Sequence, residues 1–362
     1  MKGTPDNVGN APGPEIAIDV AARFLQQGGL VAFPTETVYG LGADAENPAA
    51  VAAIYAAKGR PANHPLIVHL ATGADPGYWS NDVNASAQKL ITAFWPGPLT
   101  LILPRSARIP DAVAGGQNSI GLRCPAHPVA QALLHAFKAG KGGIAAPSAN
   151  RFGHVSPTTA SHVREEFRDS SLVRCVLEGG QSAIGIESTI LDLTRGQPVL
   201  LRPGGISPLQ IAELLGVMPA MPDAQAPRAS GSLASHYAPR TPLALVPAAQ
   251  LPRVLELLSA AGRRVALMHH TAFAAADLPV ALFNLHAFKG TMALAGSIVS
   301  NRMPSEPGAY AHDLYAVLRQ LDHVDAEIIL VETLPDSAIW RAVADRITRA
   351  AHGSSDVLKR LT

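Results

Sequence analysis

The sequence predicts an α/β protein made of two units, a larger N-terminal one and a smaller C-terminal one. Short apolar runs typical of buried strands alternate with amphipathic stretches typical of helices. The length of 362 residues exceeds what one hydrophobic core usually supports. Residues 218–242 are rich in Pro, Ala, Ser and Gly, which predicts an interdomain linker.

Composition and charge argue against several classes of protein. Apolar residues make up 48% of the chain, which favours a large core over extensive disorder. The formal net charge is only +1, so no overall field attracts nucleic acid or an acidic membrane. The two cysteines, Cys124 and Cys175, form no C-x-x-C pair, so we expect neither a zinc site nor a disulfide framework.

Cysteine usage and hydropathy also bear on location. We expect residues 1–14 to form a flexible tail, because they are Gly, Pro and Asn rich and contain no apolar stretch of a signal peptide. No run of about 18 apolar residues occurs, so we expect no membrane span. A cytoplasmic location fits both observations and the unpaired cysteines.

The N-terminal unit, residues 15–217, is expected to start with a helix over 16–27 that ends at Gly28. A second helix is marked by Asn47 as its cap, Pro48 at its first position and Gly59 at its end. The Ser-Pro pairs at 156–157 and 207–208 predict two more helix starts, the second with a capping box. Apolar runs predict strands at 30–33, 66–70, 99–103, 119–123, 144–147, 172–177, 188–193 and 199–202.

The C-terminal unit, residues 243–362, repeats the alternation on a smaller scale. Strands are expected near 243–246, 265–268, 280–283 and 327–331, with helices such as 337–351 between or after them. A Rossmann-like domain is the simplest interpretation.

Polar segments follow the ends of several predicted strands and helices, where ligands collect in open α/β sheets. The sequence lacks the phosphate loop G-x-x-x-x-G-K-[ST], H-E-x-x-H and G-x-S-x-G. Residues 34–42 offer two threonines, a glutamate and two glycines, either for a compact polar ligand or as a plain turn. Lys58 and Arg60 either clamp phosphates or complement a helix dipole.

The alternation of side chains along the predicted strands assigns further candidate binding residues to one face or the other. In the strand over 66–70, His69 lies outside the main apolar row, either as a ligand contact or as a structural histidine. In the strand over 119–123, Ser119 and Arg123 share one face. Arg123 suits a bidentate hold on a carboxylate or, equally, a buried ion pair. Residues 145–150 with Ser156 form either a ligand-binding loop or an ordinary one, and residues 185–190 and 201–204 add a hydroxyl pair and an arginine.

The order and spelling of these segments are more specific than any one of them. PTETVYGLG, KGRP followed by PLIVH, SIGLRCP, APSAN, GIESTI, LRPG and HYAP closely resemble the motifs of the threonylcarbamoyl-AMP synthase family, in its longer YrdC-like form. The resemblance covers residues 30 to about 240. It implies a YrdC-like twisted open mixed sheet with helices, linked to a smaller Rossmann-like α/β domain.

The resemblance also implies an activity. Members of this family form threonylcarbamoyl-AMP and pyrophosphate from L-threonine, bicarbonate and ATP, for the threonylcarbamoyladenosine modification of tRNA. We expect Mg²⁺ to be held mainly by the ATP phosphates and not by the protein. The adenylate is expected to pass to tRNA threonylcarbamoyl-transferase proteins, with tRNA contact indirect or weak.

Position by position, the resemblance implies two neighbouring sites. The implied L-threonine site consists of Thr37, His69, Arg123, Ala146 through its backbone, and Ser188. The implied ATP site consists of Lys58, Arg60, His64, Ser119, Ser148, Asn150, Ser156, Arg202 and Tyr237. Lys58 and Arg60 are the expected catalytic cations, since this chemistry depends on positioning and on neutralising phosphoryl oxygens.

Two segments of this sequence differ from the usual family motifs. His64 stands where many relatives carry asparagine, and the linker reads SGSLASHYAP without the Pro-Gly and basic residues often seen there. We expect the linker to fold over the pocket as a lid that excludes water from a hydrolysable intermediate.

Two rival functions are weighed against this one. Carbamoyl transfer of the hydrogenase-maturation kind involves additional zinc-finger and acylphosphatase-like domains, and two isolated cysteines cannot make the former. A noncatalytic RNA-binding module is disfavoured by the near-neutral charge and the lack of an aromatic-basic RNA motif, although a local patch stays open.

Overall fold

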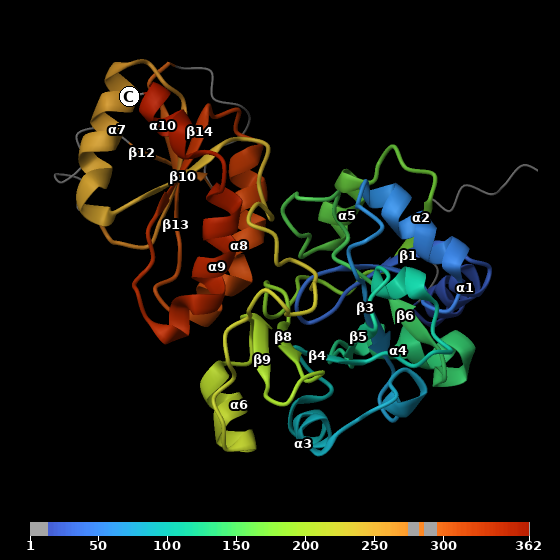
Figure 1. Ribbon diagram of the computed structural model, residues 1–362. Coiled ribbons are helices and arrows are strands. Elements are labelled where there is room, and N and C mark those ends of the chain that lie inside the picture. The colour runs from blue at the N-terminus through green and yellow to red at the C-terminus, as the bar shows by residue number, and fades with distance from the viewer. Residues whose placement is uncertain (1–13, 274–281, 286–294, 362) are drawn as a thin grey trace, which may run out of the picture.

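The protein folds around two separate sheets joined by an irregular segment (Figure 1). The structure, a computed structural model, describes residues 14–273, 282–285 and 295–361. The tail expected over 1–14 lies outside this part, except that Pro14 already begins the first helix. The strand expected over 280–283 is partly outside it as well.

The N-terminal sheet is mixed, which confirms the mixed sheet that the resemblance implied. Its strands run in the order β7-β1-β2-β6-β3-β5-β4-β8-β9. Neighbours β1 and β2 are antiparallel, whereas β3 and β5 are parallel. The strands are β1 (Leu30–Phe33), β2 (Gly40–Asp44), β3 (Ile67–Leu70), β4 (Leu99–Pro104), β5 (Ser119–Arg123), β6 (Gly143–Ala145), β7 (Val173–Val176), β8 (Thr189–Asp192) and β9 (Val199–Arg202).

Helices cover both faces of this sheet. Helices α2 (Pro48–Lys58), α3 (Ala85–Phe94), α5 (Ala160–Glu166) and α6 (Pro208–Leu215) contribute to the largest apolar core. Helices α1 (Pro14–Gln26) and α4 (Pro128–Ala136) cover the opposite face. The predicted alternation in β3 is confirmed, because Leu66, Val68 and Leu70 belong to the large core while Ile67 faces the other side.

Local helix signals were accurate at α2 and α6. The Asn47 side chain accepts hydrogen bonds from the first turn of α2, and Gly59 ends that helix with φ of 63°. Ser207 forms the predicted capping box at α6. The helix start expected at Ser156 is wrong: α5 begins at Ala160, because Thr159 caps it and the Ser156 hydroxyl donates to a carboxylate elsewhere.

Strand β2 was not predicted. Its sequence GLGAD contains two glycines, which weaken the usual strand signal. Gly42 is required by packing, because a Cβ there would come within 2.8 Å of the side chains of Phe33 and Ile144. Strand β2 therefore depends on its neighbours β1 and β6 more than on its own composition.

The C-terminal sheet is parallel and has the order β10-β14-β11-β13-β12. Its strands are β10 (Leu243–Val246), β11 (Val265–His269), β12 (Leu282–Asn284), β13 (Ile298–Arg302) and β14 (Ile328–Glu332). Helices α8 (Pro307–Asp322) and α9 (Arg341–Ala351) pack on one face, and α7 (Leu251–Ala260) and α10 (Ser355–Leu361) on the other. The Rossmann-like expectation is confirmed, although polar Ser300 and Asn301 hid β13 from prediction.

Helices α8 and α9 lie on the side of their sheet that faces the N-terminal unit (Figure 1). Val38 and Ile186 of the N-terminal unit share an apolar core with Tyr310 and Leu314 of α8. The segment between α6 and β10 runs past both units and makes isolated bridges at Ala220 and Ala238. In the described residues, no helix combines the length and apolarity needed to cross a membrane.

Candidate active site

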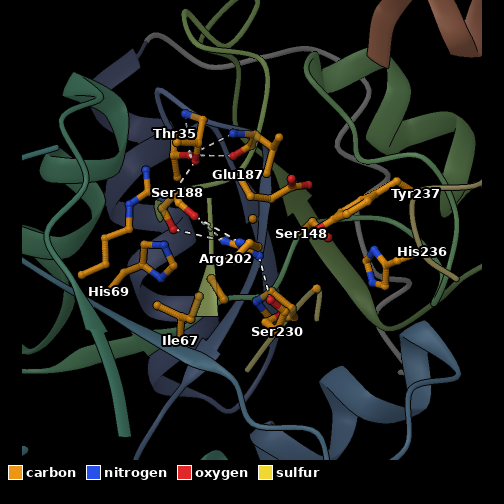
Figure 2. Close-up of a pocket in the computed structure, with 17 residues that line it drawn as sticks. Thr35, Ile67, His69, Ser148, Glu187, Ser188, Arg202, Ser230, His236 and Tyr237 are labelled. Atoms are coloured by element: carbon orange, nitrogen blue, oxygen red, sulfur yellow. Dashed lines mark hydrogen bonds between the residues drawn. The ribbon is translucent and has the colours of Figure 1, made fainter. Parts of the chain in front are cut away.

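Side chains from distant parts of the chain meet around one pocket between the N-terminal sheet and the linker (Figure 2). The pocket has a cavity volume of about 40 Å³ and is partly open to solvent. Its lining residues are Thr35, Thr37, Val38, Gly40, Ile67, His69, Arg123, Ala146, Pro147, Ser148, Glu187, Ser188, Arg202, Ser230, Gly231, His236 and Tyr237.

Arg123 lies at the end of β5 and is almost fully buried. Its Nη2 forms a 2.7 Å ion pair with Oε1 of Glu36, its Nη1 donates to Oγ1 of Thr37 at 2.8 Å, and its Nε donates to the Gly97 carbonyl at 3.3 Å. The buried ion pair left open by the sequence is thus present. Because a guanidinium has five N–H groups, these three bonds leave two for a ligand.

His69 on β3 reaches the pocket next to Arg123. Burial, together with the nearby Arg123 charge, lowers the pKa of His69 to about 3, so the ring is neutral at physiological pH. Its Nδ1 has no hydrogen-bond partner in the described structure. A buried neutral imidazole with an unused nitrogen suits a hydroxyl or amine of a small ligand.

Ser188 and Arg202 form the floor on the side of β8 and β9. The Ser188 hydroxyl lies 2.8 Å from the Thr100 hydroxyl, and Nη2 of Arg202 donates to it at 3.2 Å. Arg202 also donates to the Ser188 carbonyl through Nε and Nη2, and to the Ser230 carbonyl of the linker through Nη1 at 2.9 Å. Burial lowers the pKa of Arg202. Arg202 therefore ties the linker to the sheet with a buried positive charge.

The segment APSAN supplies another wall. Ser148 lines the pocket, and the Ala146 amide donates to the Ile67 carbonyl at 2.9 Å, so its carbonyl is the backbone group left for a ligand. Nζ of Lys58 donates to the carbonyls of Ser148, at 2.6 Å, and of Asn150. Burial holds the pKa of Lys58 well below its usual value. Lys58 lies behind the wall and does not line the pocket.

A second group of predicted residues lies beside the pocket, across Ser230. Nη2 of Arg60 donates to Oγ of Ser230 at 3.3 Å, whereas its buried Nε has no hydrogen-bond partner among the described residues. Ser119 and Ser230 both line an adjoining small hollow. His64 packs edge-on against Phe152, and burial together with the charge of Arg60 lowers the pKa of His64. Through Ser230, Arg60 and Ser119 are connected to the main pocket, whereas His64 lines neither hollow.

The last three predicted residues are Asn150 and Ser156 of the N-terminal unit and Tyr237 of the linker. Asn150 leaves its Oδ1 unpartnered among the described atoms. The Ser156 hydroxyl donates to Oε1 of Glu187 at 2.6 Å. Tyr237 lines the pocket in a left-handed backbone conformation with φ of 62°. In the part of the chain that the structure describes, its buried hydroxyl has no hydrogen-bond partner. In Figure 2, Tyr237 and His236 lie on the side opposite His69.

The structure thus brings together eight of the predicted residues in the pocket wall and leaves six around it. Thr37, His69, Arg123, Ala146, Ser148, Ser188, Arg202 and Tyr237 line the pocket. Lys58, Arg60, His64, Ser119, Asn150 and Ser156 do not. Sequence reasoning gave no individual role to Glu187, Ser230, Gly231 or His236, although all four stand in segments it singled out.

The described side chains do not form a set of ligands that would hold a metal ion permanently in the protein. In the described parts of the chain, no group of three or more His, Cys, Asp or Glu side chains is arranged to hold a metal ion. The two carboxylates at the pocket, Glu36 and Glu187, are each paired with an arginine.

Comparison with known proteins gave concordant matches. A family profile described as "Telomere recombination" matches residues 23–204, and one described as "Threonylcarbamoyl-AMP synthase, C-terminal domain" matches residues 206–352. The chain is 36% identical over 348 residues to the threonylcarbamoyl-AMP synthase of Pyrococcus abyssi, covering 93% of this chain and 94% of that one. It is 37% identical over 352 residues to the threonylcarbamoyl-AMP synthase of Bacillus subtilis, covering 94% of each.

A solved structure is similar over both domains. The crystal structure of P. abyssi Sua5 complexed with L-threonine superposes with a TM-score of 0.81 at 33% identity, covering 93% of this chain and 94% of that one. The similarity therefore includes the N-terminal sheet, the linker and the C-terminal sheet together.

Proposed function

The chain belongs to the threonylcarbamoyl-AMP synthase family, and we propose that the pocket beneath its linker carries the reaction of that family. The protein is an enzyme that forms threonylcarbamoyl-AMP for tRNA modification. We propose L-threonine, bicarbonate and ATP as its substrates, with Mg²⁺ arriving on the ATP phosphates. The product would pass to tRNA threonylcarbamoyl-transferase proteins in the cytoplasm, with tRNA contact indirect or weak.

The proposal depends on buried Arg123, which uses three of its five N–H groups in the bonds described above and keeps two for a ligand. These groups lie beside neutral His69 and the Thr37 hydroxyl. Two N–H groups match the two oxygens of an amino-acid carboxylate. The Ala146 carbonyl and the Ser188 hydroxyl would then receive the polar groups at the other end of threonine. Glu36 neutralises part of the arginine charge and fixes its plane, so the fork is oriented before threonine arrives.

The nucleotide would lie toward Ser148 and the linker. Arg202 and Arg60 supply buried positive charge there, and no described group pairs with Nε of Arg60. Ser119, Asn150, Ser156 and His64 would add hydrogen bonds around it. Lys58 would act from behind the wall through its charge and by holding the carbonyls of the Ser148–Asn150 turn. Lys58 and Arg60 stay our proposed catalytic cations.

The chemistry needs positioning more than proton transfer. The threonine amine captures bicarbonate as a carbamate with loss of water. A carbamate oxygen attacks the α-phosphorus of ATP and pyrophosphate leaves, so threonylcarbamoyl-AMP forms. Cationic side chains would stabilise the charge that builds on the phosphoryl oxygens.

The linker would act as a lid over this reaction. Ser230, Gly231, His236 and Tyr237 line the pocket, which supports the idea that the linker excludes water from the adenylate. Deleting residues 230–239 is expected to shift the product from threonylcarbamoyl-AMP to AMP. Chromatography of the nucleotides would measure the shift, and an unchanged product yield would remove the idea.

Omission of single substrates tests the activity. Purified protein is incubated with ATP, bicarbonate and labelled L-threonine, and each component is left out in turn. We expect pyrophosphate and labelled adenylate to appear only when all three are present. Pyrophosphate release that does not depend on threonine would contradict the proposed substrates.

A further inference from the structure

Glu187 is a buried carboxylate in the pocket wall that the proposed reaction does not use. Its Oε1 accepts from the Ser156 hydroxyl at 2.6 Å. Its Oε2 accepts from the Tyr315 hydroxyl at 3.0 Å and from Nε of Arg346 at 2.8 Å. Nearby Arg346 and Arg202 hold the pKa of Glu187 at about 2 despite its burial, so the group is ionised. Two of these three partners come from the C-terminal domain.

Arg346 on α9 is fully buried, as are Ser156 and Tyr315. Besides the carboxylate, it holds the Glu187 carbonyl through Nη2 at 3.2 Å and pairs with Asp345 at 2.9 Å. Its guanidinium lies over the ring of Tyr237, 5.4 Å from the centroid. One side chain of the C-terminal domain therefore touches both a pocket residue and a linker residue.

The same helix holds the linker at two further points. The Arg349 side chain donates to the Leu233 carbonyl, and the Arg349 carbonyl accepts from the His236 amide at 3.3 Å. Because His236 and Tyr237 line the pocket, the position of α9 decides where this wall stands. The left-handed φ of Tyr237 also requires support from its surroundings.

We propose that Arg346 is a positioning residue through which the C-terminal domain holds the pocket closed. It acts through Glu187, whose neighbour Ser188 lies in the floor, and through Tyr237 in the linker wall. When α9 is docked, both walls are held at the spacing that excludes water. This proposal rests on the proposed function, and it gives the C-terminal domain a task in retaining the adenylate.

The experiment compares the amounts of the two products that can form from ATP, AMP and threonylcarbamoyl-AMP. Loss of positioning admits water, so ATP plus water gives AMP plus pyrophosphate in place of the adenylate. The ratio of AMP to threonylcarbamoyl-AMP is measured for the full-length wild type, Arg346→Met and Tyr315→Phe. Arg341→Ala serves as the control, because it removes the same charge from an exposed site on the same helix.

We expect Arg346→Met to raise this ratio by about tenfold. Tyr315→Phe, which removes one hydroxyl and keeps the packing, is expected to raise it less. Arg341→Ala should keep the wild-type ratio. Arg346→Met is also expected to add little once Glu187 is replaced by Gln, because residues that act as one unit are not additive.

A purely structural role would lower both products in proportion to the folded fraction and leave their ratio unchanged. A wild-type ratio in folded Arg346→Met would overturn the proposal. If that variant does not fold, a wild-type ratio in Tyr315→Phe overturns it instead. Absence of threonine-dependent product in the wild type would overturn the proposed function and this proposal together.

Discussion

Replacing Arg123 by alanine is expected to remove most of the threonine affinity. Arg123 is buried, and three of its N–H groups donate to Glu36, Thr37 and Gly97. The two remaining N–H groups are the proposed partners of the substrate carboxylate. Removing one member of a desolvated, hydrogen-bonded charge pair costs roughly 2–5 kcal/mol, which corresponds to a loss of affinity between about 30-fold and several thousand-fold.

The same change has a cost in stability that must be separated from binding. Glu36 would keep its hydrogen bond from the Ala126 amide but would lose its arginine. Breaking a buried pair in this way lowers the free energy of unfolding by roughly 3–5 kcal/mol. Arg123→Lys keeps a charge for Glu36 but lacks the planar fork, so we expect it to recover stability better than threonine affinity.

Calorimetric titration with threonine and, separately, with ATP measures the two affinities, and thermal unfolding checks that each variant is folded. We expect the threonine affinity to fall far more than the ATP affinity. Threonine binding within twofold of the wild type, in a folded Arg123→Ala protein that has lost ATP binding, would refute the carboxylate role.

Two further predictions concern stability. Burial lowers the pKa of His69 and of His236 to about 3, whereas a histidine in the unfolded chain has a pKa of about 6.5. Between these two pH values the unfolded chain binds more protons than the folded one. The free energy of unfolding therefore falls as the pH falls. Between pH 7 and pH 5, each histidine lowers the free energy of unfolding by roughly 2 kcal/mol. An equal urea midpoint at pH 7 and pH 5 would contradict this expectation. Gly185→Ala places a Cβ 2.4 Å from the Ala311 carbonyl oxygen at φ of +81°, while Gly73→Ala has nearly the same φ, +79°, and open space. In both variants the left-handed conformation lowers the free energy of unfolding by roughly 1–2 kcal/mol. We expect a larger fall in melting temperature for Gly185→Ala because of the additional close contact. Equal falls would argue against a tight contact between the domains.

Much of the fold could be predicted because its signals are local. The cap at Asn47, the left-handed Gly59 and the capping box at Ser207 depend on residues within one helical turn. Alternation in β3 and β5 decided which side chains face the core, since the period of a strand is two. Candidate residues such as His69 and Arg123 were therefore assigned to the correct face before their partners were known.

Other features depended on contacts between distant parts of the chain. Strand β2 exists because glycines allow β1 and β6 to approach, and Ser156 fails as a helix cap because Glu187 offers a charged acceptor. Lys58 points to backbone carbonyls behind the pocket, a direction that helix position alone does not reveal.

The sequence by itself determined the two α/β units, the faces of the main strands and the segments that form the pocket. Only the tertiary structure decided that Arg123 pairs with Glu36 and that Arg346 reaches Glu187 across 159 residues. The physical reason is that strand and helix patterns arise from neighbours in the chain. A buried charge, in contrast, takes as its partner whichever group the folded chain brings within hydrogen-bond distance.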